Sequence, residues 1–245
     1  MTSRHAAEDG VTGEGTARRL ILWDIDGTLI KTGPVGEEVF VRALVRALGT
    51  PPSQRVQMSG KTDPQIILEY LALAAVADPD HWLSPILGHL EAETAQARPL
   101  FAERSRVLPG VLELLPALHA DARFLQSVLT GNIRPNALVK LGAFGLERWL
   151  DLEVGAYGSD DHDRCGLVPI ALARATRVRE VSFEPEQVWV VGDSANDLAC
   201  ARAAGARCLL VATGRAGLDE LSQLGATATL ADLGDVDAVV RLLAE

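Results

Sequence analysis

The sequence has few cysteines, a shortage of basic residues and no long apolar run. Its 245 residues include 3 cysteines, and Cys165, Cys200 and Cys208 show no metal-ligand spacing. This argues against a disulfide framework and favours a reducing compartment. The 23 Lys and Arg residues are outnumbered by 33 Asp and Glu, which gives a formal net charge of −10. Nucleic acid and anionic lipid surfaces repel a chain of this charge with no basic run, so neither is an expected partner.

Two further absences concern membranes and secretion. No stretch approaches the ~18 uninterrupted apolar residues that a membrane-spanning helix needs. Residues 1–19 are polar and glycine-rich and lack the apolar segment of a secretion signal. We therefore expect a cytoplasmic protein that acts on a small molecule.

The sequence does contain enough apolar material for a buried core, since 48% of its residues are hydrophobic and 23% are charged. Short apolar runs predict buried strands at Leu20–Trp23, Phe124–Leu129, Val188–Val191 and Cys208–Val211, with a weaker one at Leu152–Val154. Helical patterns lie between them at Val111–His119, Pro135–Leu141, Leu167–Val178, Ala195–Ala204 and Val236–Leu243. Strands that alternate with helices predict an α/β fold whose parallel sheet is covered on both faces.

One interval breaks this alternation. Residues 35–106 hold no credible buried strand, but they contain an apolar stripe at helical spacing from Val35 to Leu48. Further helical segments are expected at Pro64–Val76 and Trp82–Ala97. We interpret the interval as an all-helical insertion after the first strand. The predicted organisation is a disordered tail over residues 1–18, an α/β core over 19–33 and 107–245, and the insertion over 34–106.

Polar signatures follow three of the predicted strands. They are Asp24-Ile25-Asp26-Gly27-Thr28, Thr130-Gly131-Asn132 and Gly192-Asp193-Ser194-Ala195-Asn196-Asp197. Ligand sites of open parallel sheets form beyond the carboxyl ends of the strands, so the signatures are expected to share one crevice. The carboxylates of Asp24, Asp26, Asp193 and Asp197 would repel one another there unless a dication is bound. An all-oxygen shell suits Mg²⁺, and the sequence therefore predicts a magnesium site.

The same crevice is suited to phosphoryl transfer. The Asp24 carboxylate is an anion at neutral pH and can attack phosphorus without a base. Asp26, where Gly27 lets the chain turn away, is placed to protonate a leaving alkoxide and then to take a proton from water. Thr130, Gly131 and Asn132 are expected to bind the substrate at its phosphoryl oxygens. A cation besides the metal is also expected.

The motif Trp-Asp-Ile-Asp-Gly-Thr-Leu, together with the other two signatures, resembles the haloacid dehalogenase superfamily, in the phosphoglycolate phosphatase-like part of its phosphatase branch. The resemblance covers about residues 20–215. It implies a Rossmann-like core with a helical cap inserted after the first strand. The site residues that it implies are Asp24 as nucleophile, Asp26 as acid/base and backbone ligand of Mg²⁺, Asp193 as ligand, Asp197 as direct or water-mediated ligand, and Thr130 as phosphate holder.

The chain departs from this family pattern at the cationic residue that is expected to contact the phosphate. The family usually places a lysine before the last motif, but no lysine follows Lys140 in this sequence. Arg164 falls where that lysine would lie, and an arginine can hold phosphate through two parallel hydrogen bonds. Lys61, in the expected cap, is a candidate for binding an anionic substrate tail; the alternative is an exposed loop lysine.

These features predict a Mg²⁺-dependent phosphatase that hydrolyses a small phosphomonoester through an aspartyl-phosphate, similar to phosphoglycolate phosphatase. Two alternatives stay open, a sugar phosphomutase of the same fold and a non-catalytic regulatory module that binds metal or phosphate. The sequence selects neither one phosphomonoester nor one oligomeric state.

Overall fold

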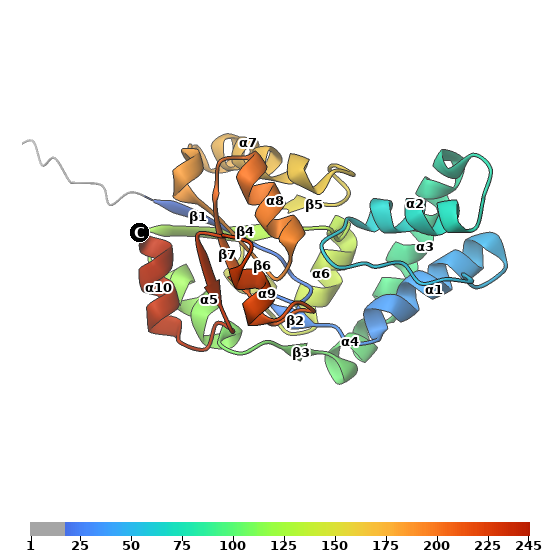
Figure 1. The fold of residues 1–245 in the computed structure, drawn as a ribbon, viewed down its shortest axis with the longest axis horizontal. Helices are drawn as coiled ribbons and strands as arrows, with labels where there is room; N and C mark the ends of the chain where they lie inside the picture. The colour runs from blue at the N-terminus through green and yellow to red at the C-terminus, as the bar shows by residue number, and fades with distance from the viewer. Residues whose placement is uncertain (1–17) are drawn as a thin grey trace, which may run out of the picture.

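The computed structural model describes residues 18–245, which form an α/β unit with a group of helices beside it (Figure 1). The tail predicted for residues 1–18 lies, except for Arg18, outside the described residues. No described helix is both long enough and apolar enough to cross a bilayer.

A six-stranded sheet in the order β5-β4-β1-β6-β7-β8 forms the centre of the α/β unit, and all its strand pairs are parallel. The strands are β1 Arg19–Trp23, β4 Phe124–Thr130, β5 Ala156–Tyr157, β6 Val188–Gly192, β7 Arg207–Val211 and β8 Ala228–Leu230. β1 and β6 are apolar on both faces because helices cover both sides of the sheet. The predicted Rossmann-like α/β fold and its four main strands are confirmed.

Alternate residues of β1 enter two different hydrophobic layers. Ile21 and Trp23 pack in the layer of α5, α6 and α10, whereas Leu20 and Leu22 pack in the layer of α7, α8 and α9. The helices of the first layer are α5 Val111–Ala120, α6 Arg134–Gly142 and α10 Val236–Ala244. Those of the second are α7 Leu167–Arg179, α8 Ala195–Ala203 and α9 Leu218–Ser222. Three 3₁₀ turns, η1 Glu147–Trp149, η2 Arg164–Gly166 and η3 Pro185–Gln187, complete the unit.

The helical group has a hydrophobic core of its own, in which Phe40, Ile67, Leu90 and Phe101 are buried. It consists of α1 Val35–Leu48, α2 Asp63–Leu73, α3 Pro79–Gln96 and α4 Arg98–Arg104. Two short strands, β2 Ile30–Lys31 and β3 Arg106–Val107, pair in antiparallel fashion where the chain leaves and re-enters the α/β unit. In Figure 1 the group stands to one side of the sheet.

The strand predicted at Leu152–Val154 is wrong. Residues 152–154 form a turn, and the edge strand is β5, which pairs with Leu129 and Thr130 of β4. Val154 is fully buried in the second layer, so its apolar character reflects packing of the turn. The strands β2, β3 and β8 and the helices α4 and α9 were not predicted, because elements of two to seven residues are too short to show a clear period.

Candidate active site

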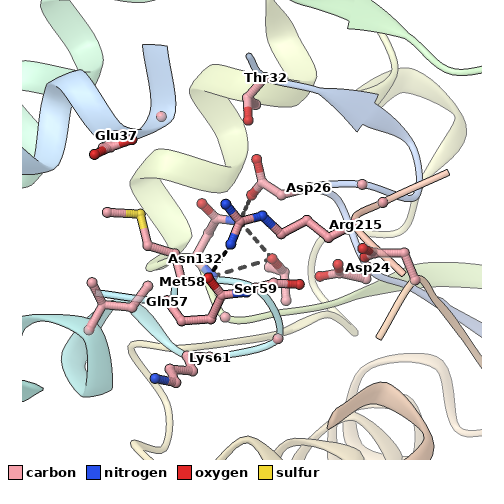
Figure 2. Close-up of a pocket in the computed structure, with 18 of the residues that line it drawn as sticks. Asp24, Asp26, Thr32, Glu37, Gln57, Met58, Ser59, Lys61, Asn132 and Arg215 are labelled. Carbon is pink, nitrogen blue, oxygen red and sulfur yellow. Dashed lines mark hydrogen bonds between the residues drawn. The ribbon is translucent and has the colours of Figure 1, made fainter. Parts of the chain in front are cut away.

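The carboxyl ends of β1, β4, β6 and β7 meet at one edge of the sheet, beside the helical group. A cavity of about 520 Å³ opens there, and the residues that line it include Asp24, Asp26, Thr130, Asp193 and Arg215 (Figure 2). The three signatures therefore share one crevice, as their positions after the strands predicted.

Asp24, Asp193 and Asp197 form an acidic cluster. One carboxylate oxygen from each lies within 4.8 Å of the others, and all three residues are buried. Burial raises the pKa of Asp24; the Arg164 charge opposes this, and Asp197 and Asp26 add to it. Burial likewise raises the pKa of Asp193, followed by the charge of Asp24. Without a dication, both groups are therefore driven towards their protonated forms.

The surroundings of Asp193 fit a small hard cation. Gly27 and Gly214 both lie against its carboxylate, and a Cβ on either would come within 2.6 Å and 1.6 Å of it, respectively. The donors are carboxylate oxygens, which Mg²⁺ prefers. Asp24 and Asp193 are the residues best able to hold the ion.

Asp197 already has protein partners at both carboxylate oxygens. Its Oδ1 accepts from Nη2 of Arg164 at 2.5 Å, and its Oδ2 accepts from the Ser194 hydroxyl at 2.6 Å and the Ser194 N–H at 3.0 Å. The Ser194 contacts belong to a capping box at the start of α8, so the sequence places this carboxylate through ordinary helix capping. Asp197 is accordingly better placed to position Arg164 than to ligate a metal directly. Of the two predicted contacts with Mg²⁺, direct or through water, its hydrogen bonds favour the one through water.

Arg164 lies in η2, just before α7, and its side chain is only 6% exposed. Its Nη2 also forms an ion pair with Oδ1 of Asp24 at 2.8 Å, so one nitrogen bridges Asp24 and Asp197. Its Nε is buried without a hydrogen-bond partner in the described part of the chain. A guanidinium therefore adjoins the predicted nucleophile and retains a free donor, as a role in phosphate binding requires.

Asp26 faces a different cation. Its Oδ2 accepts from Nζ of Lys140 at 2.6 Å and from Nδ2 of Asn132 at 2.7 Å. Burial pushes the pKa of Asp26 upward, but the Lys140 charge and these hydrogen bonds outweigh it and hold the pKa below its usual value. The Asp26 carboxylate contacts Lys140 and is not part of the acidic cluster. A contact of Asp26 with Mg²⁺ would therefore have to be made by its backbone carbonyl.

Lys140 is absent from the site residues predicted from sequence. Its Nζ also donates to Oδ1 of Asn132 at 2.6 Å, and Nδ2 of Asn132 donates in turn to Oγ1 of Thr130 at 2.7 Å. The side chain occupies a buried position of α6 beside Leu141. A lysine on the apolar face of a helix that follows the second signature was the available signal.

The predicted substrate residues Gly131 and Lys61 meet at the contact between the two parts of the protein. A Cβ on Gly131 would lie 2.0 Å from the Lys61 carbonyl oxygen, and the N–H of Asp63 donates to the Gly131 carbonyl at 2.7 Å. Both residues line the cavity, yet the Lys61 ammonium pairs with Glu69 at 2.5 Å and points away from Asp24 in Figure 2. The glycine is thus required by the close approach of the helical group.

Asp63 joins the helical group to α6. It is the first residue of α2, and its Oδ2 accepts from the Ile133 N–H at 2.8 Å and from Nδ2 of Asn136 at 3.3 Å. Burial raises its pKa to about 6, against the opposing charge of Lys140. This buried carboxyl was also not predicted, because its partners come from a distant part of the chain.

Comparison with known proteins identifies relatives for this arrangement. The chain is 31% identical over 226 residues to a plasmid-encoded phosphoglycolate phosphatase of Cupriavidus necator, with 90% of this chain and 92% of that protein covered. It is 29% identical over 212 residues to phosphoglycolate phosphatase 1 of Pseudomonas aeruginosa, with 80% and 70% covered. The crystal structure of a hydrolase from Pseudomonas syringae shares the fold, with a TM-score of 0.69, 19% identity and coverage of 93% and 100%. The family model for haloacid dehalogenase-like hydrolases matches residues 18–205, and the chain belongs to that family.

Proposed function

We propose that the protein is a Mg²⁺-dependent phosphatase that hydrolyses a small phosphomonoester through an aspartyl-phosphate on Asp24. The observation that carries the proposal is the buried Arg164 bridge between Asp24 and Asp197 beside the Asp193 carboxylate. A guanidinium and a second carboxylate, which could share a dication with Asp24, thus both lie close to the proposed nucleophile. Relatives named phosphoglycolate phosphatase support a small phosphorylated substrate.

In the first half-reaction the Asp24 carboxylate attacks phosphorus and the ester oxygen leaves. Charge accumulates on the phosphoryl oxygens, where Arg164 and Thr130 are placed to donate hydrogen bonds. A bound Mg²⁺, held by Asp24, Asp193 and the Asp26 carbonyl, would offset the charges of the carboxylates and the phosphoryl group. A bound dication would also lower the pKa of Asp24 and so favour its anionic form despite burial.

Asp26 serves the proton transfers. Its side chain lines the cavity, and Oδ1 takes no part in the contacts with Lys140 and Asn132, so we assign this oxygen to the leaving group. Lys140 favours the ionised form of Asp26 in the free protein. An approaching phosphoryl dianion would raise the pKa of Asp26, so that it takes up a proton from solvent and then donates it to the leaving oxygen. In the second half-reaction the ionised Asp26 accepts a proton from the water that attacks the aspartyl-phosphate.

We propose further that residues 34–106 act as a cap over the core formed by residues 19–33 and 107–245. The cavity is lined from both parts, by Asp24 and Thr130 on one side and Gln57 and Ser59 on the other. Closure of such a cap excludes bulk water from the aspartyl-phosphate until the leaving group has departed.

The test is phosphate release from phosphoglycolate and from p-nitrophenyl phosphate with added Mg²⁺. Asp24→Asn, which keeps the shape of the side chain but removes the nucleophile, is expected to lose activity at least about 10³-fold. Asp219→Asn, at an exposed position of α9, is the matched control and should keep the wild-type rate. Equal rates for the wild type and Asp24→Asn would refute the proposal.

The same assay separates the alternatives. A sugar phosphomutase would convert glucose 1-phosphate to an isomeric sugar phosphate without net release of phosphate. A regulatory module would bind phosphate and Mg²⁺ but release no phosphate from either ester.

A further inference from the structure

Besides Arg164 and Lys140, which pair with aspartates of the site, four cationic side chains line the cavity, and they differ in how their charge is compensated. These residues are Lys31, Arg55, Lys61 and Arg215. Arg55 pairs with Glu37 at 3.1 Å and Lys61 pairs with Glu69. Among the described residues, Arg215 and Lys31 have no carboxylate partner within ion-pair distance. The cavity therefore contains positive charge that the protein itself leaves uncompensated.

Arg215 is held in place by its own loop. The loop follows β7, and the Thr213 hydroxyl donates to the Gly27 carbonyl at 2.5 Å. Gly214, the next residue, lies against the Asp193 carboxylate, where a Cβ would come within 1.6 Å of Oδ2. The backbone that carries Arg215 is thus fixed relative to the turn that follows Asp24.

The Arg215 side chain crosses the cavity from this loop towards the helical group, as Figure 2 shows. Its Nη1 donates to Oε1 of Gln57, a neutral partner. A guanidinium has five N–H donors in a planar fork, and this contact uses one. The remaining donors are available to a ligand in the cavity.

We propose that Arg215 binds a carboxylate at the end of the substrate opposite to the phosphoryl group and so selects phosphomonoesters that carry a second anionic group. The inference deepens the phosphatase proposal and rests on it. A planar guanidinium matches a carboxylate through two parallel hydrogen bonds, and Lys31 adds a second positive charge to the same cavity. Arg215 enters the cavity from the core, on the loop that follows β7.

The test compares phosphoglycolate with 2-hydroxyethyl phosphate, which has an alcohol in place of the carboxylate. Arg215→Ala is expected to lower kcat/KM for phosphoglycolate on the order of 10- to 100-fold, the usual loss for a charge-assisted hydrogen bond. The loss for 2-hydroxyethyl phosphate should be several-fold smaller, because that substrate offers Arg215 no anion.

Gln57→Ala is the matched variant, because it removes the contact across the cavity but leaves the guanidinium. It should change kcat/KM for the two substrates by the same factor. If Arg215→Ala also lowers kcat/KM for both substrates by the same factor, Arg215 only connects its loop to the helical group, and the proposal is overturned.

Equilibrium binding distinguishes this outcome from a failure of the phosphatase proposal. Calorimetric titration of the Asp24→Asn protein with each phosphate ester does not depend on turnover. Weaker binding of phosphoglycolate after a second substitution, Arg215→Ala, with a smaller change for 2-hydroxyethyl phosphate, would support the carboxylate site even if the wild type hydrolyses neither ester. Equal losses for both esters would refute it.

Discussion

Replacement of Asp63 by Asn should stabilise the protein, and more so at higher pH. Asp63 is 4% exposed, and it joins α2 to the start of α6 by accepting the Ile133 N–H. An asparagine keeps an oxygen for that hydrogen bond. The same oxygen can keep the contact with Nδ2 of Asn136. What Asp63→Asn removes is the buried negative charge.

The size of the effect follows from the raised pKa of Asp63. The difference between its ordinary pKa of 3.8 and its folded pKa of about 6 is equivalent to about 3 kcal/mol. Because the folded pKa is the higher one, the folded state binds the proton more tightly than the unfolded chain does. Stability is therefore lost as the pH rises from about 4 through 6 and stays lost above that range.

Asp63→Asn should accordingly raise the free energy of unfolding by up to about 3 kcal/mol above pH 7 and by less than ~1 kcal/mol near pH 4. For a chain of 245 residues, this corresponds to a gain in Tm of about 6 °C at the higher pH. Differential scanning calorimetry at several pH values between about 4 and 8, with a chelator present, measures it. Asp24 and Asp193 titrate identically in both proteins, so the difference in Tm isolates Asp63.

Asp80→Asn, at an exposed position in the first turn of α3, is the matched control and should leave Tm almost unchanged at every pH. The reasoning would be refuted if Asp63→Asn shifted Tm equally at pH 5 and pH 8. It would also be refuted by a lower Tm than wild type at pH 8.

Three further predictions concern the charged groups of the site. Arg164→Ala should lower kcat on the order of 10²-fold or more, measured as phosphate release, because it removes a donor to the phosphoryl group. Its Mg²⁺ affinity, measured by calorimetry, should change little. A wild-type rate would contradict the role assigned to Arg164. Lys140→Met should raise the pKa of Asp26, since the largest of the influences that oppose burial is then removed. Carbon-13 NMR titration of the carboxyl measures this pKa, and an unchanged value would count against the Lys140 contact. Chelation of Mg²⁺ should abolish turnover. Calorimetry should show weaker Mg²⁺ binding at pH 6 than at pH 8, because protons compete with the ion for Asp24 and Asp193. A Mg²⁺ affinity that does not vary with pH would exclude both aspartates as ligands.

Sequence alone predicted those parts of the site that depend on strand ends. Asp24, Thr130 and Asp193 directly follow or end long apolar strands, and the carboxyl ends of neighbouring parallel strands necessarily lie together. For these three residues local pattern and sheet topology were enough. Arg164 was assigned differently, from the family resemblance, because it falls where the family's lysine would lie, just before the helix α7.

The missing residues depend on contacts between distant elements. Lys140 lies near its partners Asp26 and Asn132 only after α6 has packed on the sheet, and its ammonium also lies 6.0 Å from the centre of the Phe101 ring in α4. The Asp63 contact with Ile133 likewise joins residues 70 positions apart across the two parts of the protein. No local period encodes such pairings, so sequence predicts the existence of the helices but not which side chains they bring together.

Asp24 and Asp26, the proposed nucleophile and acid/base, stand two positions apart, yet the structure places them in opposite electrostatic surroundings. Asp26 forms an ion pair with Lys140, and the pKa of Asp26 lies below its usual value. Asp24 shares Arg164 with Asp197 and faces Asp193, and its pKa is raised because burial and the neighbouring carboxylates outweigh the single guanidinium. Environments that push two carboxyl pKa values apart assign them different roles. In the proposed mechanism, a dication at Asp24 would lower the pKa of the nucleophile, whereas Lys140 already keeps the pKa of the acid/base low, so metal binding would act mainly on the attacking carboxylate.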